Sequence, residues 1–183
     1  MKKVGIIGVS GYTGLELIKI LLSHPGFEIS YLGASTDGEI SEIFPQLRGV
    51  FEMRVEAADA RVAAQRCELV FLALPHEKAM EFAREILKFK NVKVVDLSAD
   101  YRLSRELYEK NYTAHLDPQN LAHAVYGLPE LNREKIRMAR LTANPGCYPT
   151  CSILALAPFV QLLDPSIGVF IDAKSGVSGA GKA

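Results

Sequence analysis

The sequence predicts an α/β protein whose larger, N-terminal part is a doubly wound parallel sheet, followed by the start of a second domain. Three observations support this fold class. Short β-branched and apolar runs alternate with segments of helical periodicity, as in sheets built from βαβ units. A glycine-rich turn follows the first of these runs. With 49% apolar and 23% charged residues, the chain has the composition of a globular protein with a sizeable core.

The predicted elements follow one another in a regular order. Strands are expected at residues 3–8, 27–33, 68–74, 92–96, 141–144 and 167–174. Helices are expected at residues 12–23, 57–66, 77–89, 105–110 and 149–163. Between residues 98 and 140 the pattern is looser, and only the one short helix and several loops are expected there. A domain change is placed near residues 144–147, so that residues 1–146 form the first domain and residues 147–183 begin the second.

Charge and cysteine content exclude several classes of function. The chain has 21 basic and 21 acidic residues and a pI near 6.9, so it lacks the charge excess that nucleic acid or an anionic membrane requires. No apolar stretch is long enough to span a bilayer, and the N-terminal apolar run is too short for a signal peptide. Three cysteines are too few for a disulfide framework. We therefore expect a soluble cytoplasmic protein with no nucleic-acid partner, no membrane partner and no metal site.

The glycine-rich turn covers residues 8–14, between the first strand and the first helix. Gly8 can turn tightly, Gly11 lets the backbone approach a pyrophosphate, and Gly14 permits close packing of helix on strand. Free N–H groups at the helix start would hold the negative charge. Tight turns also use glycine for geometry alone, but the strand before and the helix after favour a Rossmann-type dinucleotide site. The predicted contacts are Gly8, Ser10, Gly11, Tyr12, Thr13 and Gly14.

The end of the second strand bears on which dinucleotide binds. NAD-binding folds usually carry an acid there, whereas this chain has small residues up to Ser35 and Thr36, and its first acid is Asp37. A carboxylate would repel a 2′-phosphate, but a hydroxyl such as that of Ser35 can donate to it. This favours NADP; the alternative is that Asp37 turns inward and NAD binds. Pro75, at another strand end, is also expected to line the crevice, and His76 beside it is more simply a helix-start residue than a catalytic one.

The segment 144–150 places a cysteine at the start of a helix. Pro149 suits a first helical turn, so Cys147 is expected just ahead of the helix N-terminus, a position that exposes a thiol and lowers its pKa. Cys151, within the helix, and Cys67 are expected to be structural, and an inert Cys147 is the alternative. With a nicotinamide cofactor, an activated thiol can attack a carbonyl or acyl phosphate before hydride transfer. That is the chemistry of phosphorylating aldehyde dehydrogenases.

Six segments together carry a family resemblance. They are GVSGYTG (8–14), LALPH (72–76), DLSADYRL (96–103), YGLPEL (126–131), NPGCYPT (144–150) and DAKSGVSGAGK (172–182). The chain resembles N-acetyl-γ-glutamyl-phosphate reductase of arginine biosynthesis, a family related to aspartate-semialdehyde dehydrogenase. The first segment alone is weak evidence, whereas NPGCYPT with SGVSGAG downstream is specific. The resemblance implies that residues 147–183 begin an α+β catalytic and dimerisation domain, and that the protein is a homo-oligomer.

The resemblance also implies roles for individual residues. Cys147 would displace phosphate from the acyl phosphate of N-acetylglutamate to form a thioester, which NADPH reduces to the semialdehyde. Arg102, Ser98 and Asn144 would bind the phosphate, since a guanidinium suits that anion; a salt-bridged Arg102 and a turn-capping Asn144 are the alternatives. The loop of Ser178 and Gly179 would approach the nicotinamide.

The family's general base is a histidine in an H-x-H-like motif downstream of that loop, and none of the four histidines of this chain has such a context. This predicts a fragment that binds cofactor but does not turn over substrate. Two alternatives for the function remain open. A related reductase of carrier-protein-linked aminoadipyl phosphate or of aspartyl phosphate would share these motifs. A non-catalytic nucleotide-sensing module would keep the glycine turn but would need neither Cys147 nor Arg102.

Overall fold

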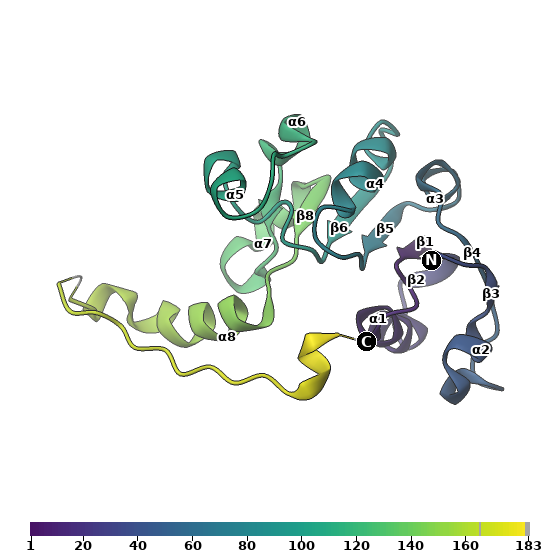
Figure 1. Cartoon of the computed structure of the whole chain (residues 1–183), viewed down its shortest axis with the longest axis horizontal. Helices are drawn as coiled ribbons and strands as arrows, with labels where there is room; N and C mark the ends of the chain where they lie inside the picture. Colours follow the sequence, from purple (N-terminus) through teal and green to yellow (C-terminus); the bar gives the residue numbers. More distant parts are fainter. Residues whose placement is uncertain (165, 182–183) are drawn as a thin grey trace.

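An eight-stranded sheet organises the computed structural model, which describes residues 1–164 and 166–181 (Figure 1). The strands lie in the order β3-β4-β2-β1-β5-β6-β8-β7, and every pair is parallel except β3 with β4. The strands are β1 (Lys2–Ile7), β2 (Phe27–Ala34), β3 (Gly38–Glu39), β4 (Arg54–Ala57), β5 (Leu69–Leu72), β6 (Lys93–Asp96), β7 (Val125–Tyr126) and β8 (Leu141–Ala143). The chain builds outward from central β1 in one direction and then in the other, which confirms the doubly wound α/β fold.

Helices cover both faces of this sheet (Figure 1). They are α1 (Tyr12–Leu22), α2 (Ile40–Ile43), α3 (Ala60–Arg66), α4 (Ala79–Ile86), α5 (Arg105–Asn111), α6 (Pro118–Leu121), α7 (Pro129–Met138) and α8 (Cys147–Leu156), with 3₁₀ turns η1 (Pro45–Leu47), η2 (Ala157–Leu162) and η3 (Val177–Ala180). Side chains alternate along β1: Val4 and Ile6 pack in one apolar cluster with α1, whereas Ile7 packs in the other with α3 and α4. Both faces of the central strand are therefore buried, as parallel sheets require.

Several elements differ from the sequence-based expectation. Residues 54–57 form strand β4, so α3 begins at Ala60, three residues later than expected. The region expected to hold mostly loops also contains α6, β7 and α7. Helix α7 is polar in composition and buries none of its residues, so the sequence offers no run of core residues that would indicate it.

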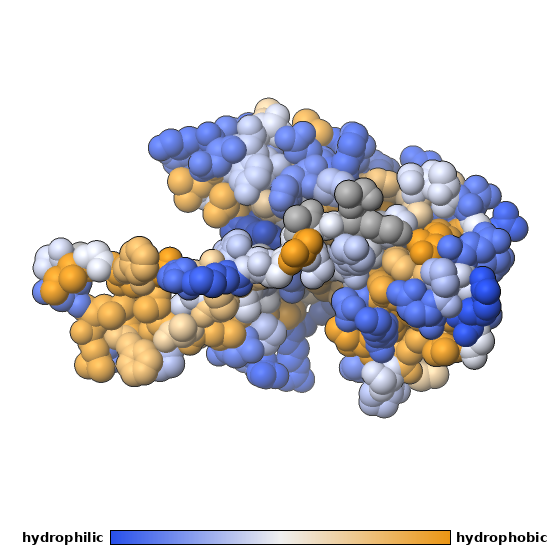
Figure 2. All heavy atoms as spheres, turned by 60° about the horizontal axis from the view of Figure 1, so that its bottom comes forward, coloured by the Kyte–Doolittle hydropathy of each residue, from blue (hydrophilic) through white to orange (hydrophobic). Residues whose placement is uncertain are grey.

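The strand expected at residues 167–174 is wrong. Among the described residues this segment is irregular and has no strand partner, and Phe170 is 91% exposed. A strand forms only where a neighbour completes its hydrogen bonds, whatever its β-propensity. Helix α8 and the segment after it project from the sheet, and the chain then returns to place η3 beside α1 (Figure 1). Figure 2 shows apolar residues concentrated on that projection.

No helix within the described part of the chain is both long and apolar enough to cross a bilayer.

Candidate active site

A cavity of about 690 Å³ lies where the strand order reverses, at the carboxyl ends of β1, β2 and β5. In open α/β sheets this is where ligands bind. Most of the predicted cofactor contacts line the cavity: Gly8, Ser10, Gly11, Tyr12, Thr13, Ser35, Pro75, Ser178 and Gly179. Gly14 does not line it, because it is buried under the turn. The cavity thus combines the glycine turn with η3, from the far end of the chain.

The three glycines of the turn differ in their surroundings. Gly8 has φ +86°, and a Cβ there would lie 2.2 Å from the Ala73 carbonyl oxygen. A Cβ on Gly14 would lie 2.3 Å from the Val9 carbonyl oxygen, so this glycine lets α1 pack against the turn. At Gly11 the nearest atom would be 3.8 Å away, which leaves that side of the backbone open. Gly8 and Gly14 are therefore required by the fold, whereas Gly11 leaves room at the cavity.

The start of α1 has donors available for an anion. Gly11 is the N-cap and provides no side-chain cap, and the first turn holds no acidic residue. The first N–H that bonds within the helix is that of Leu15, to the Gly11 carbonyl at 3.1 Å. The N–H groups of residues 12–14 have no intrahelical partner, and they point along the positive end of the helix dipole. Among the described residues that line the cavity, the only charged one is Lys78. These features fit the pyrophosphate of a dinucleotide.

Ser35 and Asp37 have different surroundings at the end of β2. Ser35 is exposed and lines the cavity. Asp37 does not line it, and its carboxylate pairs with Arg54 Nη2 at 3.3 Å. Because Arg54 lies in β4 on the outer side of β2, the Asp37 carboxylate is directed to that side and not toward the cavity. The arrangement disfavours an inward-turned Asp37 that would select NAD.

Cys147 is the first residue of α8, not a residue just ahead of it as expected, and it is exposed. Gly146 is the N-cap, and its carbonyl oxygen accepts from both the N–H of Thr150 (3.0 Å) and its Oγ1 (2.8 Å). Cys151 is also exposed and donates its thiol to the Tyr148 carbonyl, so the expectation that it packs as an apolar residue is wrong. The cause is that α8 projects from the sheet and buries none of its residues.

Arg102 lies against the turn that carries Cys147. Its Nε donates to the Asn144 carbonyl at 2.8 Å and its Nη2 to the Leu97 carbonyl at 2.7 Å. A Cβ on Gly146 would lie 3.1 Å from Nη1. In residues 1–164 and 166–181 it forms no ion pair, so the salt-bridged alternative is not what the structure shows. The side chain of Asn144 donates to the Pro145 carbonyl at 3.1 Å, within the same turn.

Ser98 is 1% exposed, and its hydroxyl is already in use. It donates to Asp96 Oδ2 at 2.8 Å and accepts from the Asp100 N–H at 3.0 Å. In this arrangement Ser98 shapes the loop between β6 and Arg102, and its hydroxyl does not face an open phosphate site.

Burial raises the pKa of Asp96 to about 6, against the opposing effect of hydrogen bonds from Ser98. Asp96 and Asp100 were not among the site residues expected from the sequence, although polar residues alternate from the last residue of β6, at positions 96, 98 and 100.

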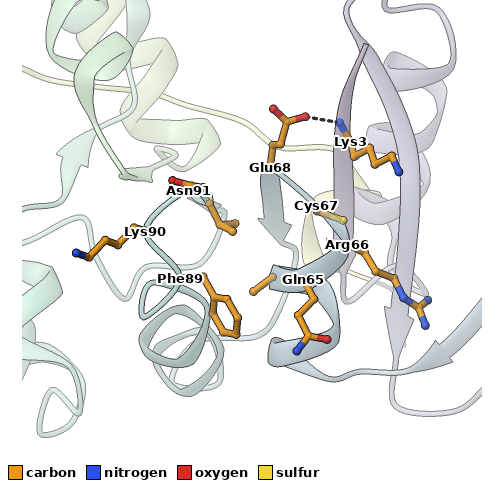
Figure 3. A pocket seen from close by; sticks show the side chains of 10 residues that line it. Lys3, Gln65, Arg66, Cys67, Glu68, Phe89, Lys90 and Asn91 are labelled. Carbon is orange, nitrogen blue, oxygen red and sulfur yellow. Dashed lines mark hydrogen bonds between the residues drawn. The ribbon is translucent and has the colours of Figure 1, made fainter.

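A second cavity, of about 680 Å³, lies at the opposite edge of the sheet (Figure 3). Its lining includes Lys3 at the start of β1, Cys67 and Glu68 before β5, and Lys90 before β6. The Glu68 side chain accepts from the Lys3 N–H at 3.1 Å. The carboxyl ends of α3 and α4 lie here, not amino ends, and there is no glycine turn. Burial raises the pKa of the Cys67 thiol to about 11, which fits the structural role expected of it. This edge does not suit a dinucleotide.

Comparisons with known proteins agree with this geometry. Residues 3–139 match the family model "Semialdehyde dehydrogenase, NAD binding domain", and residues 147–183 match "Semialdehyde dehydrogenase, dimerisation domain". Curated relatives named N-acetyl-gamma-glutamyl-phosphate reductase are 79% identical over 182 residues in Campylobacter hominis and 60% identical over 186 residues in Wolinella succinogenes. Each alignment covers 100% of this chain but only 54% and 55% of the relative, so the chain spans about half their length.

Solved structures show the same fold. Aspartate semialdehyde dehydrogenase with NADP from Candida albicans has a TM-score of 0.67 at 19% identity, covering 88% of this chain and 47% of that one. The enzyme from Francisella tularensis has a TM-score of 0.62 at 16% identity, covering 88% and 41%. The resemblance drawn from the six sequence segments is confirmed by the names of the relatives. Because the first family model matches well over half of its residues, the chain belongs to the semialdehyde dehydrogenase family.

Proposed function

We propose that this chain forms the nucleotide-binding and nucleophile-bearing part of an NADPH-dependent N-acetyl-γ-glutamyl-phosphate reductase. This oxidoreductase reduces N-acetylglutamyl 5-phosphate to the 5-semialdehyde and releases phosphate. One observation carries the proposal: the Arg102 guanidinium lies against the turn of the exposed Cys147, at the same sheet edge as the dinucleotide cavity. The names of the curated relatives support the choice of substrate.

The cavity residues hold the cofactor. The open backbone at Gly11 and the N–H groups of Tyr12 and Thr13 receive the pyrophosphate, while Gly14 lets α1 pack against the turn. Ser35 donates to a 2′-phosphate, which favours NADP. Pro75, Ser178 and Gly179 form further walls. When bound, NADPH supplies the hydride for the reduction.

Cys147 performs the covalent step. Its thiolate attacks the acyl carbon, the bond from that carbon to the phosphate oxygen breaks, and phosphate leaves with the electron pair. Arg102, with Nη1 beside the turn, and Asn144 hold the phosphate, while Ser98 keeps their loop in shape. After reduction of the thioester carbon, the carbon–sulfur bond breaks, giving the aldehyde and, with a proton, the free thiol. We expect the general base for these proton transfers to be a residue other than the four histidines of this chain.

Three broader proposals accompany this function. Residues 1–146 form the nucleotide-binding domain and residues 147–183 begin the catalytic and dimerisation domain, which is supported by the separate family models on the two sides. The protein assembles as a homo-oligomer, in line with the description of the second model. It acts in the cytoplasm on a small-molecule substrate.

Replacing each of the two cysteines of α8 with serine, one at a time, tests the proposal. In the protein from the complete reading frame, we expect Cys147→Ser to lower the rate of NADPH oxidation with N-acetylglutamyl phosphate by about a thousandfold or more. NADP⁺ binding, measured by calorimetry, should stay unchanged. Cys151→Ser, at the other exposed thiol of α8, is the matched control and should keep full activity.

Semialdehyde formation by Cys147→Ser would contradict the thioester route. Aspartyl phosphate and carrier-linked aminoadipyl phosphate, tried as substrates, distinguish the related reductases. A nucleotide sensor would reduce none of the three acyl phosphates and would be indifferent to the loss of Cys147.

A further inference from the structure

Two loops at the carboxyl edge of the sheet are joined by hydrogen bonds. We call residues 73–78, after β5, the cofactor loop, because Ala73, Leu74, Pro75 and Lys78 line the cavity. We call residues 97–102, after β6, the arginine loop. The Ala99 N–H of the arginine loop donates to His76 Nδ1 at 2.9 Å, and the Glu77 N–H of the cofactor loop donates to Asp100 Oδ1, also at 2.9 Å. The two bonds run in opposite directions between the loops.

His76 accepts the first of these two hydrogen bonds at its ring nitrogen Nδ1. Because Nδ1 accepts a backbone N–H, the neutral ring carries its proton on Nε2. Tyr112 contacts the ring edge-on, with 5.8 Å between the ring centroids. The side chain is nevertheless exposed and lies three residues before the start of α4. A helix-start residue without chemistry would need no acceptor aimed at a different loop.

Asp100, in the protein interior, accepts the second of the two hydrogen bonds between the loops. It is fully buried, and Oδ1 accepts from the Tyr108 hydroxyl at 2.9 Å in addition to the Glu77 N–H. Its backbone carbonyl bonds His115 Nε2 at 2.8 Å. Glu77 meets this fixed carboxylate with φ +72°, in the left-handed region that non-glycine residues rarely adopt. The backbone of the cofactor loop is therefore held in a costly conformation by its bond to the arginine loop.

The arginine loop ends at the residue that lies beside the nucleophile. Arg102 holds the carbonyls of Leu97 and Asn144, and Nη1 lies against Gly146. A continuous set of contacts thus leads from the cavity wall through His76 and Ala99 to Arg102 and the turn of Cys147. Because Nε and Nη2 donate to the Asn144 and Leu97 carbonyls, the direction of Nη1 depends on the position of the arginine loop relative to that turn.

We propose that His76 is a positioning residue: by accepting the Ala99 N–H, it sets the arginine loop so that Arg102 presents Nη1 to the phosphate of the substrate. This inference rests on the proposed function. His76 touches no reacting atom in this scheme, and its effect is on phosphate binding rather than on nucleotide binding.

The test compares two variants of His76 with one of His24. His76→Ala removes the acceptor. His76→Asn restores one, because Asn Oδ1 stands the same number of bonds from Cα as His Nδ1. His24→Ala is the matched control, since exposed His24 also accepts a backbone N–H at Nδ1, from Gly26 at 3.1 Å, at the far end of α1. The measurements are KM and kcat for the acyl phosphate, the Kd of inorganic phosphate and the Kd of NADP⁺.

We expect His76→Ala to raise KM for the acyl phosphate and Kd for phosphate by about 10- to 100-fold, the cost of a misplaced binding group. The Kd of NADP⁺ should change by less than about twofold, and His76→Asn should recover most of the phosphate affinity. The inference is overturned if His76→Ala behaves like His24→Ala, if NADP⁺ binding falls as much as phosphate binding, or if His76→Asn is as weak as His76→Ala. A wild-type protein without reductase activity would refute the proposed function alone, because phosphate binding is measured without turnover.

Discussion

Replacing Glu77 with glycine should stabilise the protein, contrary to the usual effect of introducing glycine. Glu77 has φ +72°, its side chain is exposed, and within the described residues that side chain forms no hydrogen bond. A non-glycine residue pays about 1–2 kcal/mol for the left-handed conformation. Glycine relieves this strain but makes the unfolded chain more flexible, at a cost of about 0.5–1 kcal/mol. The net expectation is a gain of about 0.5–1 kcal/mol in the free energy of unfolding.

The bond from residue 77 to Asp100 comes from the backbone N–H, so glycine keeps it. Urea denaturation followed by circular dichroism measures the change, and the melting temperature should rise by about 2 °C. Glu81→Gly is the matched control: Glu81 is exposed in the first turn of α4, where backbone conformation is helical, and glycine should destabilise there by about 0.5–1 kcal/mol.

Equal destabilisation by Glu77→Gly and Glu81→Gly would refute the reasoning. It would mean that the conformation at residue 77 carries no strain, or that the Glu77 side chain holds the cofactor loop in place. A stabilised Glu77→Gly would show instead that the bond between the two loops is maintained against a local conformational cost.

Two further predictions concern the buried carboxylate and the glycine turn. The pKa of Asp96 is raised in the folded protein, so its contribution to stability is present below about pH 4 and is lost as the pH rises through about 6. Between pH 4 and pH 7, the free energy of unfolding of the wild type should fall by about 2–3 kcal/mol relative to that of Asp96→Asn. If the free energies of unfolding of the two proteins changed in parallel with pH, this prediction would be contradicted. Gly14→Ala should lose about 2–3 kcal/mol, because its Cβ meets backbone at 2.3 Å. Gly11→Ala should lower the free energy of unfolding by less than about 1 kcal/mol, yet weaken NADP⁺ binding by about tenfold or more. If the two alanine variants behaved alike in both assays, the roles assigned to Gly11 and Gly14 would be contradicted.

The sequence predicts best the features that local pattern determines. Alternating apolar segments indicated β1, β2, β5, β6 and β8, and the glycine spacing located the cavity wall. It failed where a pattern was missing or misleading. Helix α7 has no buried face, β7 has two residues, and residues 167–174 have the β-propensity of a strand without a partner beside them.

Much of the candidate site depends on contacts between distant segments. Arg102 binds the carbonyl of Asn144, 42 residues away, and His76 binds the N–H of Ala99, 23 residues away. A single sequence contains no local pattern for such pairs. Ser98 is buried and its hydroxyl bonds both Asp96 and Asp100, which the local sequence does not reveal, so an exposed phosphate contact was the simpler expectation.

The walls of the dinucleotide cavity come from the two ends of the described chain. Gly8 and residues 10–13 form one side, and Ser178 and Gly179 form another. The entropic cost of closing a loop grows only with the logarithm of its length, so holding these ends together is little harder than closing a much shorter loop. A nucleotide that contacts both walls would act as a reversible, noncovalent crosslink between the sheet and the irregular segment after α8.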